Sequence, residues 1–428
     1  MASRHVRPAL PPGPYLVVGL GRSGTAAALA LRARGEEVIG WDAGAPEPET
    51  LQRLSKAGVE VRVDASGAAV AATSEARTLV KSPGVPQDAA PVAPAREQGI
   101  PILGELELAW RLLPNEFVAV TGTNGKTTTT EWIGHIHREA RRPVAVAGNV
   151  GTALSTLVGD APPDATIVCE ASSFQLEDAS AFAPEAAALL NLAPDHLDRH
   201  ATYEAYVAAK LRIFANQGPE DVAVVPPGMS ATTRARVIAY GTGPELELAD
   251  AITLPGEHNR ANGMAAAAIC LARGIDPETV EQGLATFRGV PHRLELVADV
   301  DGVAFVNDSK ATNVDSTLMA LRAYEAGVHL IAGGRGKQQD FAPLAPLVAE
   351  RCVAVYLVGE AAPELAEALA NAEVPIHQTG DLATALQNAR ALAEPGETVL
   401  LSPACASYDQ YRDFEERGEH FRALVEAG

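Results

Sequence analysis

A glycine-rich turn between an apolar run and an expected helix, VTGTNGKTTTT at residues 120–130, constrains the fold of this chain more than any other feature. Residues 117–120 predict a buried strand, and the helix is expected to begin at Lys126 and Thr127. Such a turn can hold the β- and γ-phosphates of a nucleotide through its backbone N–H groups, the helix dipole and the lysine, while the threonine can ligate Mg²⁺. An ordinary glycine turn fits this order of elements less well. The generic loop would carry glycine at Val120, so this loop belongs to a subset.

Length and composition bound the architecture. A chain of 428 residues is too long for one compact core, and two or three domains are expected. Hydrophobic residues make up 47% and aromatic residues 5%, so the core is expected to consist mainly of Ala, Val and Leu. Apolar runs alternate with Ala-rich helical stretches, which predicts an α/β fold with mostly parallel sheets.

Charge and terminal sequence exclude some partners. The formal net charge of −20 argues against a nucleic-acid backbone or an anionic membrane as partner. The first residues lack the apolar centre of a signal peptide, and no apolar run approaches the ~20 residues that span a bilayer. A cytoplasmic protein is expected. Its four scattered cysteines predict reduced thiols rather than a disulfide framework or a metal site.

Three segments follow one another along the chain. Their predicted boundaries are 1–107, 108–289 and 290–428, and the Pro/Gly-containing joins near Pro101 and at residues 289–291 are the expected hinges. Sequence patterns predict strands in each segment, joined by helices.

The first segment opens with YLVVGLGRSG, in which a strand at residues 15–18 leads into Gly19, Gly21 and Gly24. The next strand ends at Asp42, so the pattern resembles a dinucleotide-binding unit. The glycines allow a tight turn and bring backbone N–H groups close to a diphosphate at a helix N-terminus. The pattern indicates a diphosphate without specifying NAD.

The second segment carries a carboxylate at the end of the run TIVCE. Glu170 would be costly to bury there without a cation or hydrogen bonds, and a Mg²⁺ partner acid commonly occupies such a strand end. Ser172 and Gln175 follow it and add polar groups. The loop APDHLDRH at residues 193–200 fits a second cation site and solvated histidines equally well. Lys210 alone indicates a solvated helix lysine.

Polar side chains also follow three predicted strand ends in the third segment, an arrangement that predicts a site for an anionic substrate. The side chains are Arg293, Asp308, Lys310, Thr312, Lys337 and Ser407.

Several motifs taken together resemble the Mur ligase family, in order and in spacing, over nearly the whole chain. The motifs are GTNGKTT, GNVG, EASSFQLE, DHLDRH, AAKLRIF, HNRAN, PHRLE, NDSKATN and SPACASYDQY followed by FEERG. The resemblance implies a Rossmann-like N-terminal domain that binds a UDP moiety, a central P-loop ATPase domain, and a Rossmann-like C-terminal domain that binds the incoming amino acid. The turn at residues 120–130 is then a shorter G-x-x-G-K-T phosphate loop.

The resemblance also implies an activity. The chain is expected to be an ATP-dependent amide ligase of peptidoglycan precursor synthesis. It would add D-glutamate to UDP-N-acetylmuramoyl-L-alanine through an acyl phosphate, with ATP and two Mg²⁺ ions, as a monomer.

The residues implied for ATP are Gly122, Thr123, Asn124, Gly125, Lys126, Thr127, Thr128, Asn262, Arg293 and Asp308. The implied Mg²⁺ ligands are Thr127, Glu170, His196 and Lys210. The family's lysine at the last position is carbamylated by CO₂, which converts a cation into a carboxylate-like ligand. The implied catalytic residues are Lys126, Glu170, His196 and Lys210.

Two more sites follow from the same resemblance. The residues implied for the UDP-linked substrate are Gly19, Gly21, Arg22, Ser23, Gly24, Asp42, Ser82, Gly84, Asn149, Ser172 and Gln175. The residues implied for the carboxylates of D-glutamate are Lys310, Thr312, Lys337, Ser407 and the backbone of Phe414.

Two positions depart from the family pattern. No arginine follows WDAG, so Asp42 is expected to recognise uracil together with other groups. Arg335 stands where several relatives carry aspartate.

Other functions fit parts of the sequence. Another Mur-type or folylpolyglutamate-type ligase could use the same central domain, although SPACASYDQY argues against it. An NAD-dependent oxidoreductase could use GLGRSG with the central domain as a regulator, and it would bind NAD without needing ATP. A nucleotide-driven binding module would hydrolyse ATP without a UDP-sugar acceptor.

Overall fold

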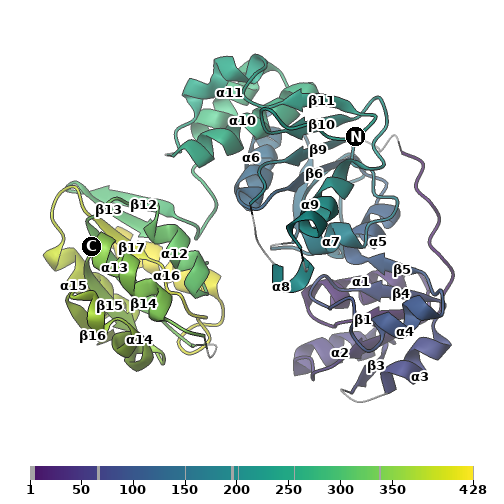
Figure 1. The fold of residues 1–428 in the computed structure, drawn as a ribbon, viewed down its shortest axis with the longest axis horizontal. Coiled ribbons are helices and arrows are strands. Elements are labelled where there is room, and N and C mark those ends of the chain that lie inside the picture. Colours follow the sequence, from purple (N-terminus) through teal and green to yellow (C-terminus); the bar gives the residue numbers. More distant parts are fainter. Residues whose placement is uncertain are drawn as a thin grey trace. The chain divides into compact units, whose positions relative to one another are not determined.

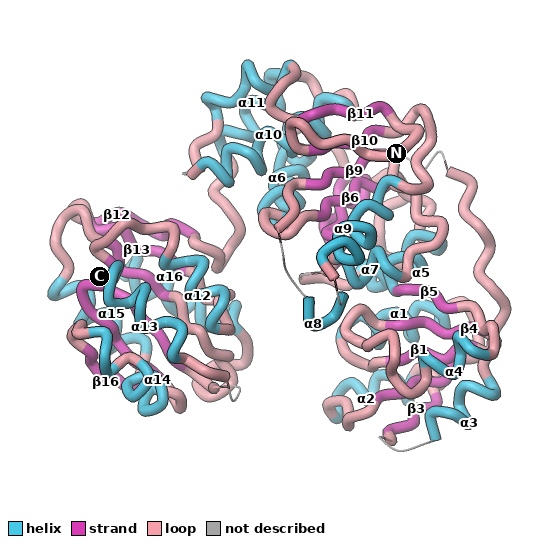
Figure 2. The backbone as a smooth tube through the Cα atoms, viewed as in Figure 1, coloured by secondary structure: helices cyan, strands magenta, loops and turns pink. Residues whose placement is uncertain are grey.

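The computed structural model describes residues 5–64, 68–149, 151–193, 197–200, 202–254, 256–336 and 339–427. The chain forms two compact units, Met1–Phe287 and Arg288–Gly428. Strands and helices alternate along both units, and the described strands form three sheets (Figures 1 and 2). The predicted boundary at residues 107/108 falls inside a helix, and the one at 289/290 lies two residues beyond the division between the units. The domain limits remain predictions.

The first part of unit 1 is a five-stranded parallel sheet in the order β3-β2-β1-β4-β5. Its elements are β1 (Tyr15–Val18), α1 (Arg22–Ala33), β2 (Val38–Asp42), α2 (Pro48–Lys56), β3 (Glu60–Val63), α3 (Ala68–Glu75), β4 (Thr78–Lys81), α4 (Val92–Glu97) and β5 (Ile102–Gly104). Alternate residues of β1 enter two hydrophobic clusters, one shared with α1 and α2 and the other with α3 and α4. Helices therefore cover both faces of the sheet.

The strand order of this sheet reverses beside β1, which pairs with β2 on one side and with β4 on the other. In open α/β sheets, ligands bind at the carboxyl ends of the strands at such a switch point. The glycines that follow β1 stand at this point, so the fold places them where a diphosphate site is expected.

The central part of unit 1 is a six-stranded parallel sheet in the order β11-β10-β9-β6-β8-β7. Its strands are β6 (Phe117–Thr121), β7 (Val144–Gly148), β8 (Thr166–Glu170), β9 (Ala186–Leu189), β10 (Val222–Val225) and β11 (Arg236–Ala239). Its helices are α5 (Glu105–Leu112), α6 (Lys126–Glu139), η1 (Leu154–Leu157), α7 (Ser173–Glu177), α8 (Leu197–His200), α9 (Tyr203–Leu211), η2 (Arg212–Phe214), η3 (Pro244–Ala251), α10 (Glu257–Ala272) and α11 (Pro277–Thr286). Every residue of β6 and β8 is buried, as expected for parallel strands covered by helices.

Unit 2 is a six-stranded sheet in the order β12-β13-β17-β14-β15-β16. Its strands are β12 (Glu295–Val300), β13 (Val303–Asn307), β14 (Val328–Gly333), β15 (Cys352–Val358), β16 (Ile376–Gly380) and β17 (Thr398–Leu401). Its helices are α12 (Val314–Leu321), η4 (Ala342–Leu344), α13 (Ala345–Arg351), α14 (Ala362–Ala368), η5 (Ala370–Ala372), α15 (Leu382–Leu392) and α16 (Phe414–Ala427).

One strand pair of unit 2 departs from the parallel pattern, because β12 and β13 are antiparallel. Asp301 and Gly302 join them with φ of 53° and 82°. A two-residue Asp-Gly loop with positive φ at both positions matches the right-handed twist of a hairpin. The other strand pairs of this sheet are parallel.

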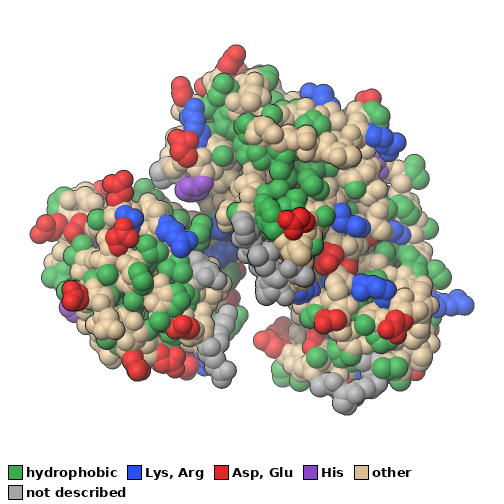
Figure 3. Space-filling model, viewed as in Figure 1, with side chains coloured by type: hydrophobic (Ala, Val, Ile, Leu, Met, Phe, Trp, Pro, Cys, Tyr) green, Lys and Arg blue, Asp and Glu red, His purple; other side chains and the backbone are tan. Residues whose placement is uncertain are grey.

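The surface and the cysteines agree with the composition. On the visible face of each unit, basic side chains are interspersed among acidic ones (Figure 3). Cys169, Cys270 and Cys405 are buried, and Cys352 is half-buried. Among the described residues, no helix is both long and apolar enough to cross a bilayer.

A buried ion pair joins the two sheets of unit 1. Lys81 at the end of β4 lies with its Nζ 2.8 Å from Oδ2 of Asp178, which follows α7, and the two side chains are 0% and 7% exposed. Gln87 donates to the other oxygen of Asp178 at 2.9 Å. Gly104 lies so close that an added Cβ would be 2.9 Å from the Cβ of Asp178. The N-terminal sheet is thus fixed to the central domain at this point.

Replacement of Lys81 by Met should leave a buried, unpaired carboxylate at Asp178. Removing one partner of a buried pair costs about 3–5 kcal/mol, so the urea midpoint of unit 1 should fall markedly, followed by tryptophan fluorescence. Arg62→Ala is the matched control, because Arg62 pairs with Glu60 and Glu75 on the surface. It should cost less than about 1 kcal/mol. Equal losses in the two variants would contradict a special role for the buried pair.

Candidate active site

The glycine-rich turn after β6 has the geometry of a phosphate loop. Gly125 precedes α6 with φ of 84°, and an added Cβ there would lie 2.1 Å from Oδ1 of Asn262. Only glycine meets both demands, because other residues rarely adopt this φ and would clash with the buried Asn262. The Nζ of Lys126 donates to the carbonyls of Gly122 and Thr123 at 3.1 and 2.9 Å. The lysine ammonium thus lies against the loop.

A buried carboxylate lies beside the first turn of α6. The Oγ1 of Thr127 donates to Oε2 of Glu170 at 2.7 Å, and Nδ2 of Asn149 donates to its Oε1 at 3.1 Å. Glu170 is 3% exposed, and these two donors are neutral. A buried carboxylate is costly without a cation. A hydroxyl and a carboxylate are oxygen ligands of the kind that Mg²⁺ prefers, so the two residues fit the predicted metal.

Lys210 corrects one sequence-based interpretation. The pattern of α9 alone indicated a solvated lysine, but its side chain is 2% exposed. Its Nζ donates to the carbonyl of Gly122 at 2.7 Å and lies 4.6 Å from the ring centre of Tyr206. The Tyr206 hydroxyl is 2.9 Å from Oγ1 of Thr123. Lys210 therefore belongs to the surroundings of the glycine-rich loop, and its role as a Mg²⁺ ligand stays a prediction.

The loop at residues 193–200 is described only in part. His196, predicted to ligate Mg²⁺, lies outside the described residues, as does Lys337, predicted to bind D-glutamate. His200 is buried, its Nε2 lies 2.9 Å from Oγ of Ser173, and its ring stacks on Phe174. It is a packed histidine. Within the described ranges, no group of three His, Cys, Asp or Glu side chains is arranged to hold a metal.

A pocket of about 510 Å³ lies between the two sheets of unit 1. Of the residues predicted for the UDP-linked substrate, those that line it are Gly19, Gly21, Arg22, Ser23, Asp42, Ser82, Gly84, Asn149 and Gln175. Gly24 and Ser172 do not. An added Cβ at Gly24 would lie 1.8 Å from the Gly19 carbonyl oxygen, so this glycine permits α1 to pack on the turn. Ser172 caps α7 and accepts from the backbone N–H of Gln175.

Sequence reasoning missed part of this pocket. The additional lining residues are Trp41, Ala43, Pro83, Val85, Pro86, Ala89, Gly148 and Ala153. Most of them flank a predicted residue, and the stretch SPGVP at residues 82–86 was the available signal. Asp42 accepts from the backbone N–H groups of Leu20 and Gly44 at 2.6 and 3.0 Å. Its carboxylate thus shapes the turn after β1 as well as lining the pocket.

Unit 2 holds a buried acid at the end of β13. Asp308 accepts from Oγ of Ser402 at 2.8 Å and from the backbone N–H of Leu294 at 3.2 Å. Burial raises the pKa of this carboxyl to about 7, although Arg293 and Lys310 act in the opposite direction. The predicted ATP residues Arg293 and Asp308 are therefore close in space.

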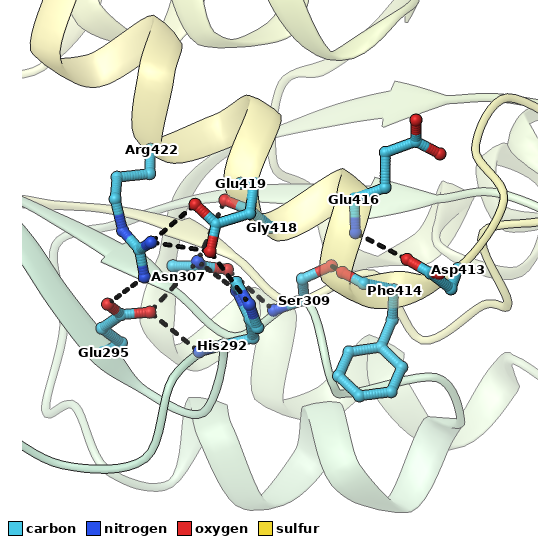
Figure 4. A network of polar contacts seen from close by, with 10 residues as sticks. All are labelled: His292, Glu295, Asn307, Ser309, Asp413, Phe414, Glu416, Gly418, Glu419 and Arg422. Carbon is cyan, nitrogen blue, oxygen red and sulfur yellow. Dashed lines mark hydrogen bonds and ion pairs between the residues drawn. The ribbon is translucent and has the colours of Figure 1, made fainter. Parts of the chain in front are cut away.

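Of the residues predicted for D-glutamate, Lys310 and Thr312 lie in the loop after β13, and Ser407 lies in the loop after β17. The carbonyl of Lys310 accepts from the N–H of Thr312 at 2.9 Å, and the carbonyl of Ser407 accepts from the N–H of Tyr411 at 2.8 Å. Phe414 begins α16, whose first turn is capped by Asp413 through the N–H of Glu416 (Figure 4). These loops are the ones that the strand-end argument selected.

A buried arginine that sequence reasoning missed holds these loops together. Arg417 is 2% exposed, and it donates to Oγ of Ser309 at 2.9 Å and to the carbonyl of Cys405 at 3.1 Å. Burial lowers the pKa of its guanidinium to about 10. Its position in FEERG was the only sequence signal. Arg335, one of the departures from the family pattern, pairs with Glu360 on the surface.

A polar network fixes the start of unit 2 to α16 (Figure 4). The Nδ1 of His292 lies 3.0 Å from Nδ2 of Asn307. The backbone N–H of His292 donates to Oε2 of Glu295 at 2.8 Å. Arg422 of α16 pairs with Glu295 at 2.6 Å. An added Cβ at Gly418 would lie 2.1 Å from the His292 ring. The network holds the segment next to Arg293 in place.

Three family models match the sequence. Residues 14–104 match the Mur ligase MurD-like N-terminal domain, residues 120–245 the Mur ligase middle domain, and residues 292–405 the Mur ligase glutamate ligase domain. The chain belongs to the Mur ligase family. Its three domains and mostly parallel sheets confirm the predicted fold class.

Similar proteins agree with this assignment. The UDP-N-acetylmuramoylalanine–D-glutamate ligase of Pelotomaculum thermopropionicum is 43% identical over 96% of this chain and 96% of its own length. The enzyme of the same name from Acidobacterium capsulatum is 42% identical over 96% of this chain and 95% of its own length. The structure of UDP-N-acetylmuramate-alanine ligase from Thermotoga maritima matches with a TM-score of 0.54 at 20% sequence identity. The match covers 97% of this chain and 99% of that protein. At this identity, the Thermotoga maritima structure supports a shared fold and nothing more.

The buried Asp308 makes the stability of unit 2 of this Mur ligase depend on pH. Its pKa is about 7 in the folded chain and about 3.9 when unfolded, so the folded state binds the proton more tightly. Stability should therefore fall as pH rises from about 4 to about 7, by up to about 1.4 kcal/mol per pH unit. Hydrogen exchange of β13 in urea, corrected for intrinsic exchange, measures this loss.

Asp308→Asn should flatten this pH dependence, because the amide carries no charge at either pH. Asp301→Asn, on the exposed turn between β12 and β13, is the matched control and should retain the wild-type slope. An unchanged slope in Asp308→Asn would contradict the assignment.

Proposed function

We propose that this Mur ligase adds D-glutamate to UDP-N-acetylmuramoyl-L-alanine with hydrolysis of ATP. One observation carries the proposal: Asn149 lines the pocket of the UDP-substrate residues and also donates to Glu170, which accepts from Thr127 of the phosphate loop. A carboxyl group at this end of the pocket would lie next to the γ-phosphate. The D-glutamate acceptor is supported by the names of the relatives and by the match to a glutamate ligase domain.

The chemistry explains why the two sites adjoin. A carboxylate is a poor electrophile, so its oxygen first attacks the γ-phosphorus and ADP leaves, giving an acyl phosphate. The amine of D-glutamate then attacks the acyl carbon and loses a proton. The tetrahedral intermediate collapses to the amide as the C–O bond to phosphate breaks. Inorganic phosphate leaves with one oxygen of the original carboxylate.

The first step brings two anions together, and the chain supplies compensation. Lys126 neutralises the phosphate oxygens, and backbone N–H groups at the start of α6 face the same charge. Thr127 and Glu170 would hold one Mg²⁺, and His196 with a carbamylated Lys210 a second. Bound Mg²⁺ would screen the phosphates and polarise the γ-phosphorus. Arg293 and Asp308 are proposed to contact ATP, and the loops around Ser407 and Phe414 to bind D-glutamate.

The cellular context is part of the proposal. The UDP-linked substrate and ATP are cytoplasmic metabolites, so we place the protein in the cytoplasm. We propose that it acts as a monomer without nucleic-acid or membrane partners, since its net charge of −20 would oppose both.

Phosphate release with a panel of acceptors tests the proposed function. Release from ATP should require both UDP-N-acetylmuramoyl-L-alanine and D-glutamate, and it should fail with L-glutamate or with UDP-N-acetylmuramate as acceptor. Lys126→Ala should abolish the signal, which excludes a contaminating ATPase. Release that needs no UDP-sugar would instead indicate a nucleotide-driven binding module.

Lys210→Ala should lose activity, and a short-chain carboxylic acid should restore part of it. The buried amine can add CO₂ and release a proton, and the resulting carbamate would bind Mg²⁺. Acetate or propionate can occupy the space left by the side chain and supply the missing carboxylate. Lys56→Ala on α2, far from the loop in sequence, is a control that should need no rescue. A dead variant that no acid restores would leave the carbamate unsupported.

A further inference from the structure

One wall of the pocket is a short loop with few hydrogen-bond donors of its own. Residues 82–86, SPGVP, all line the pocket. Two of the five are prolines, which lack a backbone N–H. The Val85 N–H donates to the carbonyl of Ser82 at 3.0 Å, whereas the carbonyls of residues 83–85 accept from side chains outside the loop. The position of this part of the wall therefore depends on where those side chains stand.

An arginine of the central domain supplies most of these donors. Arg199 of α8 donates from Nη1 to the carbonyl of Gly84 at 3.2 Å, and from Nη2 to those of Pro83 and Val85 at 3.3 and 2.5 Å. Three consecutive carbonyls thus converge on one guanidinium. A planar group with five N–H donors suits this arrangement, whereas an ammonium cannot span three carbonyls in the same geometry.

The same arginine rests on a helix of the active-site region. Its guanidinium carbon lies 4.7 Å from the ring centre of Phe174, and this ring stacks on that of His200 at 5.2 Å. Phe174 stands in α7, between Ser172 and the pocket-lining Gln175. The packing fixes the direction of the guanidinium, because it holds the group against a flat aromatic face.

Two further bonds fix the ends of the wall within the N-terminal sheet. Lys81 donates from Nζ to the carbonyl of Val85 at 2.9 Å, and Oγ of Ser82 donates to the carbonyl of Gly19 at 2.7 Å. The wall is therefore held to the glycine turn on one side. Arg199 provides the connection to the central domain on the other side.

We propose that Arg199 is a positioning residue for the UDP-linked substrate, a role that rests on the proposed function. It holds the carbonyls of the pocket wall at residues 83–85 and so sets the width of the pocket, without contacting the phosphate loop. Loss of the three hydrogen bonds should free the wall to move and so weaken binding of the UDP-linked substrate.

Binding measurements on four proteins test this role. The dissociation constants of UDP-N-acetylmuramoyl-L-alanine and of a non-hydrolysable ATP analogue are measured separately by calorimetry. Arg199→Ala should raise the first at least about tenfold, equivalent to about 1.4 kcal/mol, and change the second less than about twofold. Arg199→Lys should fall between Arg199→Ala and the wild type. Arg62→Ala, which removes surface pairs of the same sheet, should match the wild type.

The outcomes distinguish a failure of the positioning role of Arg199 from a failure of the proposed function. An unchanged affinity of Arg199→Ala for the UDP-sugar would overturn the positioning role and leave the proposed function standing. Equal loss of affinity for both ligands would show a general loss of structure and would also overturn it. A wild-type protein that binds the ATP analogue but not the UDP-sugar would overturn the proposed function and the positioning role together.

Discussion

The buried carboxylate of Glu170 is the interaction on which the active-site region depends. The strand register determines its position, because Glu170 pairs with Val120 of β6 on one side and with Gly148 of β7 on the other. The phosphate loop, the acid and Asn149 therefore lie together at the carboxyl ends of the strands. Gly148 makes the approach possible, because an added Cβ would lie 2.3 Å from the Glu170 carbonyl oxygen. One side chain thus connects the glycine-rich loop after β6 with Asn149, which lines the pocket between the two sheets of unit 1.

Burial strengthens the electrostatic interactions around the Glu170 carboxylate. Lys126 and Lys210 both donate to the carbonyl of Gly122, and Lys210 is as deeply buried as Glu170, at 2% against 3% exposed. Charges removed from water are costly unless they meet opposite charges, and interactions between them are stronger than at the surface. A site of this kind gains most from phosphates and Mg²⁺, which supply both signs of charge. The arrangement is therefore better suited to phosphoryl transfer than to a purely structural role.

The sequence predicted the fold where patterns are local and strong. Buried strands such as β1, β6 and β8 are continuous apolar runs, and the glycine turns that follow β1 and β6 are specific motifs. The strands β3, β4, β5, β10, β11 and β16 were not predicted. They are short, and β3, β11 and β16 are edge strands whose residues are half-exposed or exposed, so the hydrophobic pattern of these three is weak.

Tertiary burial was harder to predict than secondary structure. Nothing in the helical pattern of α9 shows that Lys210 turns inward, and only the family resemblance assigned it a role. Arg199 and Arg417 were missed for the same reason, because each donates to a backbone carbonyl of a loop remote in sequence. Such contacts leave no local signature, since any loop offers carbonyls.

Transfer of labelled oxygen tests the central claim, that ATP activates a carboxylate of the UDP-linked substrate at the phosphate loop. UDP-N-acetylmuramoyl-L-alanine carrying ¹⁸O at both oxygens of its alanine carboxylate is converted with ATP and D-glutamate, and the released phosphate is analysed by mass spectrometry. The account predicts one ¹⁸O atom in each phosphate, because the C–O bond of the acyl phosphate breaks when the amine attacks. Phosphate without ¹⁸O, formed together with the amide, would contradict it.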